Sequence, residues 1–357
     1  MKRNLFQKLF FVGTIVAFFI AVLPACKEDN NSATEQADTT KLVALLDSCQ
    51  TLLDEATTDD YPESAITTFQ SIVTTARTAI SSSAVTQTVV DNLVVQVRAA
   101  KETFLAAAYD AIPTSALILG ISFDETVSNS QFTTEGKGWT AVLKSGPSEI
   151  FGTATNLPSF VTGKSGNAMY FSNGAHLEIS DYAANDLMGN KMSIAVWVNP
   201  DSTRAGNYIA SYNYWKTWKF QLQAQNKPFF TVSTTKGVTD ADNQSDFSAP
   251  NKTWTHLVVT LDLAAETMSF YVNGVNTMTW TTNEKPDLTG ALTSYSNTLP
   301  LMIGACTTYA EAKAAWDWSW AETPANWDSF IGSMDEFKVY NIALTDGQVA
   351  KLYKEEK

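Results

Sequence analysis

The spacing of hydrophobic residues changes near residue 112. Between residues 41 and 109, apolar side chains recur at the i, i+3, i+4, i+7 spacing of an amphipathic helix. The breaks TTDDYP (57–62) and SSSAVTQT (81–88) divide this region into three stretches. The pattern therefore predicts three amphipathic helices with short connections, which should pack as a small antiparallel bundle over residues 41–110.

Downstream of Ile112-Pro113 the pattern is that of short β-strands. Residues 116–123 (ALILGISF) form a continuous apolar run, and Gly, Asn and Pro then separate further apolar stretches at short intervals. About a dozen strands are expected, which indicates an antiparallel sandwich or barrel over residues 114–357. The candidates are 116–123, 139–143, 168–171, 176–179, 191–198, 206–212, 217–223, 228–233, 254–261, 267–272, 276–280, 299–304 and 329–340.

Two local motifs support this organisation. Asn273-Gly274 lies between two strand candidates, and this dipeptide supplies the positive φ angles of a type I′ hairpin turn. Near the C-terminus, Thr345 is followed three residues later by Gln348, which is the spacing of a capping box. A short final helix is therefore expected to begin there and to pack against the sandwich.

The N-terminus has the pattern of an export signal. A basic start is followed by a long apolar run. The run ends in Leu-Pro-Ala-Cys at Cys26, which resembles the lipobox of bacterial lipoproteins, in which the cysteine carries the lipid. We therefore expect a signal peptide over 1–25, lipidation of Cys26 and a flexible polar tether over 26–40. The alternatives are an ordinary secretion signal and a membrane anchor.

The residues after Cys26 suggest a location. Lys27-Glu28-Asp29 is similar to the acidic export tag with which certain Gram-negative, glycan-degrading bacteria send lipoproteins to the cell surface. No later stretch approaches the ~20 apolar residues of a membrane span. The resemblance implies an outer membrane lipoprotein that is exposed at the cell surface and held to the membrane by its lipid.

Charge and cysteine content exclude several function classes. The net charge of −13 has the wrong sign for a phosphate-binding surface, so a nucleic acid partner is not expected. With two histidines and no CxxC pair, a zinc site built from His and Cys is excluded. Cys49 and Cys306 lie in different predicted domains, so we expect no disulfide between them, and Cys49 fits the apolar face of a helix.

Five stretches of the strand-rich region resemble laminin-G-like, concanavalin-A-like jelly-roll domains in order and spacing. They are GKSGNAMYF (163–171), MSIAVWVNP (192–200), WTHLVVTLDLAAETMSFYVNGV (254–275), LMIGA (301–305) and FIGSMDEFKVYNIALTDGQVAKLY (330–353). The resemblance covers residues 117–353 and implies a mainly β protein, in which a two-sheet antiparallel jelly-roll sandwich follows the three-helix bundle. One of the two sheets should be concave.

The same resemblance implies a structural calcium ion, which many members of the family bind. The matching acidic positions are Asp124 and Asp335. Calcium takes about six to eight oxygen ligands, so backbone carbonyls and water would have to complete the site. The alternative is that Asp335 caps a turn or pairs with a cation. Ser172-Asn173-Gly174 stands where family members usually place Asp before Gly, so the chain departs from the pattern there.

Residues 254–261 (WTHLVVTL) contain one of the two histidines. Alternation along this strand predicts one side that faces the core. His256 is then expected to be a hydrogen-bonded strand histidine without a catalytic partner. Trp197 and Trp254 lie in family-pattern strands, so they are expected to pack within or on the sheets.

The acidic residues show no arrangement for catalysis. Glycosidases on folds of this type use two carboxylates roughly 5–10 Å apart. On a strand their usual signature is a Glu-x-Asp-x-Glu alternation, which this sequence lacks. A Ser/His/Asp set and a Gly-rich phosphate loop are also missing from the sequence. We therefore expect a protein that is not an enzyme.

Two aromatic-rich stretches favour glycan binding. They are AAWDWSWAETPANW (314–327) and NYIASYNYWKTW (207–218). Aromatic rings offer flat apolar faces to the C–H faces of pyranose rings, and neighbouring Asn, Asp and Gln side chains can bond the hydroxyls. The predicted ligand-binding residues are Trp316, Trp318, Trp320, Trp327, Tyr212, Tyr214 and Trp215. The alternative for both stretches is that the rings anchor a loop as a small satellite core.

These features together predict a non-catalytic, cell-surface carbohydrate-binding lipoprotein. It would capture poly- or oligosaccharides for a bacterial polysaccharide-uptake system. One alternative is an adhesion or structural module that binds a protein partner. Another is a glycoside hydrolase or lyase that uses unconventional acids.

Overall fold

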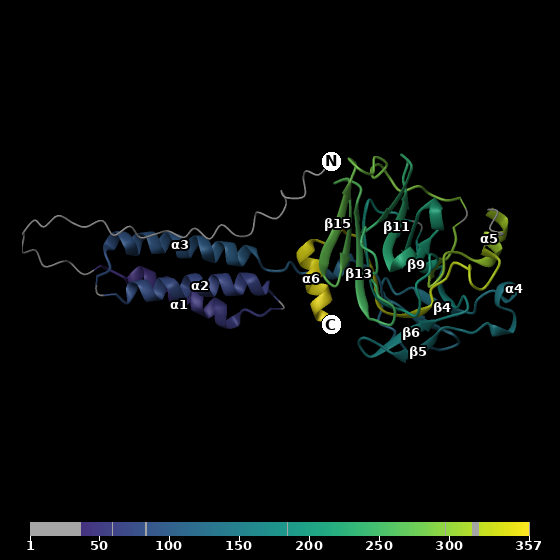
Figure 1. Ribbon diagram of the computed structural model, residues 1–357, viewed down its shortest axis with the longest axis horizontal. Coiled ribbons are helices and arrows are strands. Elements are labelled where there is room, and N and C mark those ends of the chain that lie inside the picture. The colour runs from purple at the N-terminus through teal and green to yellow at the C-terminus, as the bar shows by residue number, and fades with distance from the viewer. Residues whose placement is uncertain are drawn as a thin grey trace, which may run out of the picture.

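The computed structural model describes most of the chain beyond the predicted tether. The described residues are 37–357 except Asp59, Ser83, Ala184, Asn297, 316–320 and Lys357. The predicted signal peptide, Cys26 and most of the predicted tether therefore lie outside the described residues. Figure 1 shows a helical module beside a larger β-domain.

Three helices form the helical module. They are α1 (Thr40–Glu55), α2 (Glu63–Ile80) and α3 (Gln87–Ala106). Their apolar stripes meet in a core that includes Leu46, Cys49 and Val73, each with no exposed surface. Burying such aliphatic side chains contributes about 1.5–3 kcal/mol each. In the described part of the chain, no helix is long and apolar enough to cross a membrane.

The β-domain is a sandwich of two antiparallel sheets. The first, here called sheet A, has nine strands, and its main path runs β15-β14-β13-β8-β17-β1-β3. Strand β6 also pairs with β17, and β5 pairs with β6. The strands of sheet A are β1 (Leu117–Ile121), β3 (Glu135–Gly136), β5 (Ser159–Thr162), β6 (Asn167–Phe171), β8 (Lys191–Pro200), β13 (Thr255–Asp262), β14 (Thr267–Val272), β15 (Val275–Thr281) and β17 (Gly332–Tyr340).

The second sheet, here called sheet B, has eight strands in the order β12-β11-β10-β9-β16-β7-β4-β2. They are β2 (Gln131–Thr133), β4 (Thr140–Lys144), β7 (His176–Ile179), β9 (Asn207–Tyr212), β10 (Trp218–Gln223), β11 (Lys227–Ser233), β12 (Val238–Asp242) and β16 (Leu301–Ile303). Short helical segments lie between the strands: η1 (Thr114–Ala116), α4 (Ser148–Phe151), η2 (Gly152–Ala154), η3 (Tyr214–Lys216), η4 (Ala224–Asn226) and α5 (Tyr309–Ala315).

The inner faces of the two sheets share one apolar core. It joins aromatic side chains of sheet B, such as Trp218 and Phe220, to side chains of sheet A, such as Phe270 and Phe337. The expected hairpin is present, because β14 and β15 are joined by Asn273 and Gly274 with positive φ angles of 50° and 78°. The predicted mainly β, two-sheet jelly-roll sandwich with preceding helices is confirmed.

The C-terminal helix α6 (Asp346–Glu355) covers the outer face of sheet A. It starts at the expected capping box, in which Thr345 and Gln348 bond each other's backbone N–H groups. Val258 on β13 packs in the cluster under this helix, whereas Leu257 and Val259 belong to the inner core. The predicted core-facing side of β13 is therefore confirmed, and α6 buries its second side as well.

Helix α6 also contacts the helical module. Lys354 Nζ donates to the Tyr109 hydroxyl at 3.1 Å and to the carbonyl of Thr58. Gln348 Nε2 donates to the carbonyl of Ala111 at 3.2 Å, in the segment that connects α3 to the sandwich. One helix thus packs on the sandwich and holds the end of the bundle beside it (Figure 1).

Candidate functional site

Of the four predicted ligand-binding rings that the structure describes, three do not present a face to solvent. Trp316, Trp318 and Trp320 lie outside the described residues. Tyr212, Tyr214 and Trp327 are buried, with exposed fractions of 3%, 0% and 4%. The expectation that these three rings stack on a glycan is corrected here, because packing already covers them.

Each buried ring has a structural task. The ring of Tyr212 lies 5.9 Å from that of Trp218 in the inner core. The Tyr214 hydroxyl donates to Glu311 Oε1 at 2.7 Å and so ties η3 to α5. Trp327 belongs to the satellite cluster on the outer face of sheet B, where its ring lies 6.0 Å from that of Tyr309. Trp327 and Tyr214 therefore match the alternative that the rings anchor a loop as a small satellite core.

Trp215 is the predicted ring that the structure leaves half-buried within the described part of the chain. It sits on η3, which follows Asn213 in a left-handed conformation with φ of 53°. Tyr208 and Tyr214 contact it edge-on, with ring centroids 6.4 and 6.3 Å away. The ammonium of Lys219 lies 4.5 Å from its ring centroid. These contacts fix the orientation of the Trp215 ring.

A cavity of about 350 Å³ opens beside Trp215 on the outer face of sheet B. This volume falls at the lower end of the ~300–1,000 Å³ typical of small-molecule sites. The lining residues come from the β8–β9 connection, β9, η3 and the segment before β17. They are Arg204, Ala205, Gly206, Tyr208, Trp215, Ala325, Asn326 and Asp328. Here this cavity is called the Trp215 pocket.

Arg204 holds one wall of the Trp215 pocket in place. Its Nη1 donates to the carbonyl of Ser329 at 3.0 Å. Its Nη2 donates to the carbonyls of Ala325 and Trp327 at 3.0 and 2.7 Å. Because hydrogen bonds to a charged donor are stronger than neutral ones, a single side chain fixes the whole 325–329 segment.

Asp328 supplies the carboxylate of the pocket. The residue is 4% exposed, and its Oδ2 has no hydrogen-bond partner within the described residues. Burial raises the pKa of Asp328 to about 7, although Lys219, Arg204 and the Tyr208 hydroxyl act in the opposite direction. At neutral pH this carboxyl group therefore exists in both protonation states.

Gly206 allows the carboxylate to approach the pocket wall closely. A Cβ added to Gly206 would lie 2.4 Å from Asp328 Oδ1. The sequence analysis did not identify Arg204, Gly206, Asn326 or Asp328. No local pattern distinguishes them, since they come together only when the segment before β17 folds over β9.

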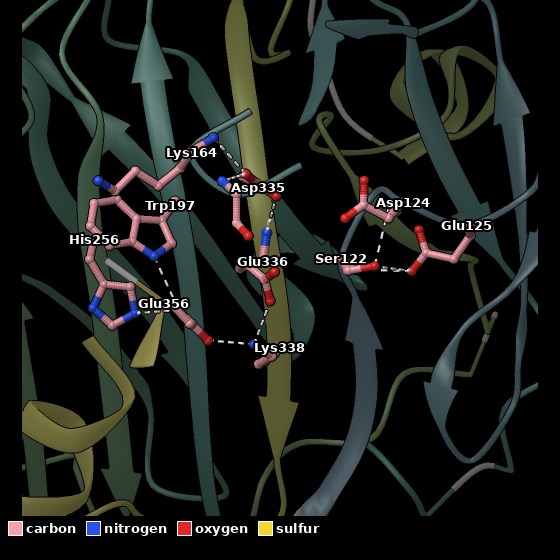
Figure 2. Close-up of polar contacts among 11 residues, drawn as sticks. Ser122, Asp124, Glu125, Lys164, Trp197, His256, Asp335, Glu336, Lys338 and Glu356 are labelled. Atoms are coloured by element: carbon pink, nitrogen blue, oxygen red, sulfur yellow. Dashed lines mark hydrogen bonds and ion pairs between the residues drawn. The ribbon is translucent and has the colours of Figure 1, made fainter. Parts of the chain in front are cut away.

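Figure 2 shows a second polar cluster, on the outer face of sheet A. His256 has no exposed surface, and its ring contacts those of Trp197 and Tyr353 at centroid distances of 5.3 and 5.8 Å. Among the described residues, neither of its ring nitrogens has a hydrogen-bond partner. The prediction of a hydrogen-bonded histidine is therefore wrong. Its Nε2 lies 3.5 Å from Glu356 Oε2, which accepts from Trp197 Nε1 at 3.1 Å.

Burial sets the protonation of this cluster. It lowers the pKa of His256 to about 3, with Lys338 acting in the same direction, so the imidazole is neutral. It raises the pKa of Glu356 to about 7 against the opposing effect of Lys338. The ammonium of Lys338 bonds Glu336 at 2.6 Å and also Glu356. Packing of α6, which carries Tyr353, closes this cluster off.

The two predicted calcium ligands are held by N–H groups of one loop. Asp335 is fully buried. Its Oδ2 accepts from the backbone N–H groups of Lys164 and Ser165 at 2.8 and 3.1 Å. Its Oδ1 accepts from the backbone N–H group of Glu336 at 2.8 Å. Asp124 Oδ1 accepts from the backbone and side-chain N–H groups of Asn167 at 2.8 and 2.9 Å. Figure 2 shows both carboxylates.

This arrangement does not fit a complete calcium site. Calcium needs about six to eight oxygens, whereas N–H donors surround both carboxylates here. Across the described residues, no group of three or more His, Cys, Asp or Glu side chains could hold a metal ion. The contacts of Asp335 match the alternative that this residue caps a turn. Binding of calcium stays a prediction.

Comparison with protein-family models identifies the fold. The model described as Laminin_G_3, concanavalin A-like lectin/glucanases superfamily, matches residues 171–350. The chain belongs to this superfamily. The matched segment runs from the end of β6 into α6, so it includes every residue that lines the Trp215 pocket. Among curated proteins, no sequence matches the chain.

Several solved structures are similar to the β-domain. Domain 4 of an extracellular arabinanase from Geobacillus stearothermophilus, in complex with arabinotriose, is 19% identical with a TM-score of 0.46, covering 67% of this chain and 98% of that one. The binding domain of botulinum neurotoxin DC, in complex with rat synaptotagmin II, is 11% identical with a TM-score of 0.45. The match covers 69% of this chain and 53% of that one. This chain thus spans about half the length of the toxin domain. These likenesses concern the course of the backbone only.

Proposed function

We propose that this protein binds carbohydrate without catalysis and that the Trp215 pocket is its binding site. The observation that carries the proposal is the pairing of a half-buried, fixed indole ring with polar groups around one cavity. An aromatic face can stack on a sugar ring, while Asp328, Asn326 and the guanidinium of Arg204 can bond hydroxyl or carboxylate groups.

The absence of catalysis is part of the proposal. Among the described residues that line the Trp215 pocket, Asp328 is the only carboxylate. Glycoside hydrolysis generally needs two carboxyl groups, one to protonate the leaving oxygen and one to act as base or nucleophile. A lone carboxylate can bind a sugar but cannot supply both tasks.

The proposal extends to the cell surface. The lipobox-like sequence at Cys26 and the acidic residues after it support an outer membrane lipoprotein that is exposed to the medium. In this setting the sandwich would capture poly- or oligosaccharides for a polysaccharide-uptake system. The helical module, joined to the sandwich through α6, would hold the pocket away from the membrane.

Affinity electrophoresis and a glycan array test the binding. The chain from residue 27 onward, which contains every described residue, should bind at least one glycan, and Trp215→Ala should weaken this binding by about tenfold or more, since stacking contributes roughly 0.5–1.5 kcal/mol beyond the area buried. Trp254→Ala is the matched control, because Trp254 is also half-buried but lies outside the pocket. Specific binding to proteins and to no glycan would sink the proposal in favour of an adhesion module.

A further inference from the structure

The charged groups at the Trp215 pocket are unusual for an acidic protein. The chain has a net charge of −13, yet the pocket contains Arg204 in its wall and has Lys219 directly behind two of its lining rings. Asp328 is the carboxylate that faces these cations. The balance of charge in the pocket therefore depends on whether Asp328 carries its proton.

Arg204 retains donors for a ligand. Three hydrogen bonds go from its terminal nitrogens to backbone carbonyls of the 325–329 segment. A guanidinium has five N–H groups in a fixed plane, so two remain. Because those three bonds hold the side chain rigidly in the wall of the cavity, little ordering of Arg204 is needed for its remaining donors to bond an oxyanion there.

Lys219 is a buried cation without a carboxylate partner. The residue is 2% exposed, and its Nζ donates to Gln221 Oε1 at 2.6 Å. The rings of Tyr208, Trp215 and Phe229 surround the ammonium at 5.4, 4.5 and 4.9 Å. No carboxylate in the described part of the chain lies within ion-pair distance of it. A buried charge of this kind is costly, and an anion in the adjoining pocket would offset the cost.

Asp328 can switch from repelling an anion to binding it. Burial raises its pKa to about 7, so a small free energy suffices to protonate it at neutral pH. The protonated acid is a donor and can share its hydrogen with a second carboxylate, as closely spaced carboxyl pairs do. The ionisable groups that face it are Lys219, Arg204, Tyr208 and Cys306, and Asp240 on β12 acts on Lys219 from behind.

We propose that the Trp215 pocket takes an acidic sugar, with the carboxylate of a uronic acid residue between Arg204 and the protonated Asp328. The ring of that sugar would stack on Trp215. A cavity of about 350 Å³ is large enough for about one or two sugar rings of such a glycan. This inference rests on the proposed function, and it names the class of glycan.

The test uses matched acidic and neutral ligands. Oligosaccharides of polygalacturonate, alginate and glucuronoxylan are each paired with their carboxyl-reduced counterparts, and binding to the chain from residue 27 onward is measured by calorimetry at pH 6 and pH 8. For at least one pair, the acidic member should bind about tenfold or more tighter than the neutral one, because hydrogen bonds to charged groups are stronger than those to neutral groups. Its affinity should be up to about tenfold greater at pH 6, with proton uptake, since the pKa of free Asp328 is about 7 and that of a uronate lies far lower.

Two variants test whether the Trp215 pocket binds an acidic sugar in preference to a neutral one. Asp328→Asn imitates the protonated acid, so it should keep binding the acidic sugar at pH 8. It should keep only the smaller part of the pH dependence that comes from Lys219, whose pKa burial lowers to about 8. Lys219→Met should weaken acidic-sugar binding about tenfold while the melting curve shows that the variant is folded. Trp254→Ala again serves as the control with unchanged binding.

The possible results distinguish this inference from the proposed function. Tighter binding of carboxyl-reduced sugars, or loss of all binding in Asp328→Asn at both pH values, would overturn the acidic-sugar inference and leave carbohydrate binding intact. Failure to bind either member of every pair, together with no binding on the wider glycan array, would overturn both.

Discussion

The outer faces of the two sheets are covered in different ways. On sheet A, helix α6 lies across the strands, and Val349 and Leu352 fill an apolar cluster with Val258 and Tyr271. On sheet B, α5 and the segment before β17 cover the strands only in part and leave the Trp215 pocket beside β9. A helix with one apolar stripe seals a sheet, whereas a loop that is fixed by polar contacts can leave a cavity.

Both faces contain buried charges, and the difference lies in how these charges are paired. Under α6, Lys338 bonds two carboxylates, Glu336 and Glu356. Beside the pocket, Lys219 has rings and an amide around it, and one oxygen of Asp328 has no hydrogen-bond partner within the described residues. Under α6 the buried charges are paired, although the neutral ring of His256 has no hydrogen-bond partner among the described residues. Paired charges are compatible with a closed interface, while a buried charge without an ion-pair partner can be reserved for a ligand. We therefore assign a structural role to the first face and a binding role to the second.

The largest effect is expected under α6. Lys338→Met removes the cation that both glutamates share, so it should lower the free energy of unfolding by about 3–5 kcal/mol, because uncompensated buried carboxylates remain. Denaturant unfolding measures the change. The double variant with Glu356→Gln should recover part of the loss; a single variant as stable as the wild type would show that the cluster does not hold the helix.

The apolar contacts of α6 come next. Leu352 is 5% exposed, and Leu352→Ala should lower the free energy of unfolding by about 2–5 kcal/mol through the cavity that it leaves. Leu105, which is 44% exposed on α3, is the control, and Leu105→Ala should change stability by less than about 0.5 kcal/mol. Equal effects at the two positions would contradict the view that α6 seals sheet A.

The pH dependence of stability distinguishes the pocket from an ordinary surface. The pKa of Asp328 is about 7 in the folded protein, whereas its usual value is 3.8. Between these pH values the folded state therefore binds more protons than the unfolded state. The stability that protonated Asp328 contributes is lost as pH rises through about 7. Relative to Asp328→Asn, the wild type should lose on the order of 4 kcal/mol from pH 4 to pH 8, because the pKa difference of about 3 units is worth about 1.36 kcal/mol per unit. Parallel stability curves would show that Asp328 titrates normally.

A smaller effect is expected from displacing the Asp328 carboxylate without removing its charge. Gly206→Ala places a Cβ 2.4 Å from Asp328 Oδ1, so the side chain must move. We expect about tenfold weaker glycan binding, equivalent to about 1.4 kcal/mol, with an unfolding midpoint close to that of the wild type. Affinity electrophoresis of the variant and the wild type side by side measures the change in binding. Unchanged mobility of the variant would show that Asp328 does not contact the ligand.

The smallest effect concerns calcium. Because N–H groups already bond Asp124 and Asp335, calcium at this position should add less than about 1 kcal/mol, or about 2–4 °C in Tm for a domain of this size. Melting in millimolar calcium and in chelator decides the matter. A rise well beyond this range would mean that the loop at 163–167 rearranges to offer its carbonyl oxygens.

The sequence predicted the elements better than it predicted the site. Periodicity placed the three helices and most strands within a few residues. It missed α5 and the short or edge strands β2, β3, β5 and β12, where few residues alternate. Aromatic content led to Trp215, but it led equally to Tyr212, Tyr214 and Trp327, which are buried. Composition shows that rings are present and cannot show which of them a neighbouring segment covers.

The sequence by itself determined the local features of this protein, because these depend on residues close together in the chain. The Asn273-Gly274 hairpin and the capping box at Thr345 are of this kind. Only the tertiary structure decided what lies over each sheet. The Trp215 pocket brings Arg204 to Asp328 across more than a hundred residues, and burial then raises the pKa of Asp328 to about 7. Solvent exclusion of this kind comes from the packing of distant segments, so it cannot be predicted from any short stretch of sequence.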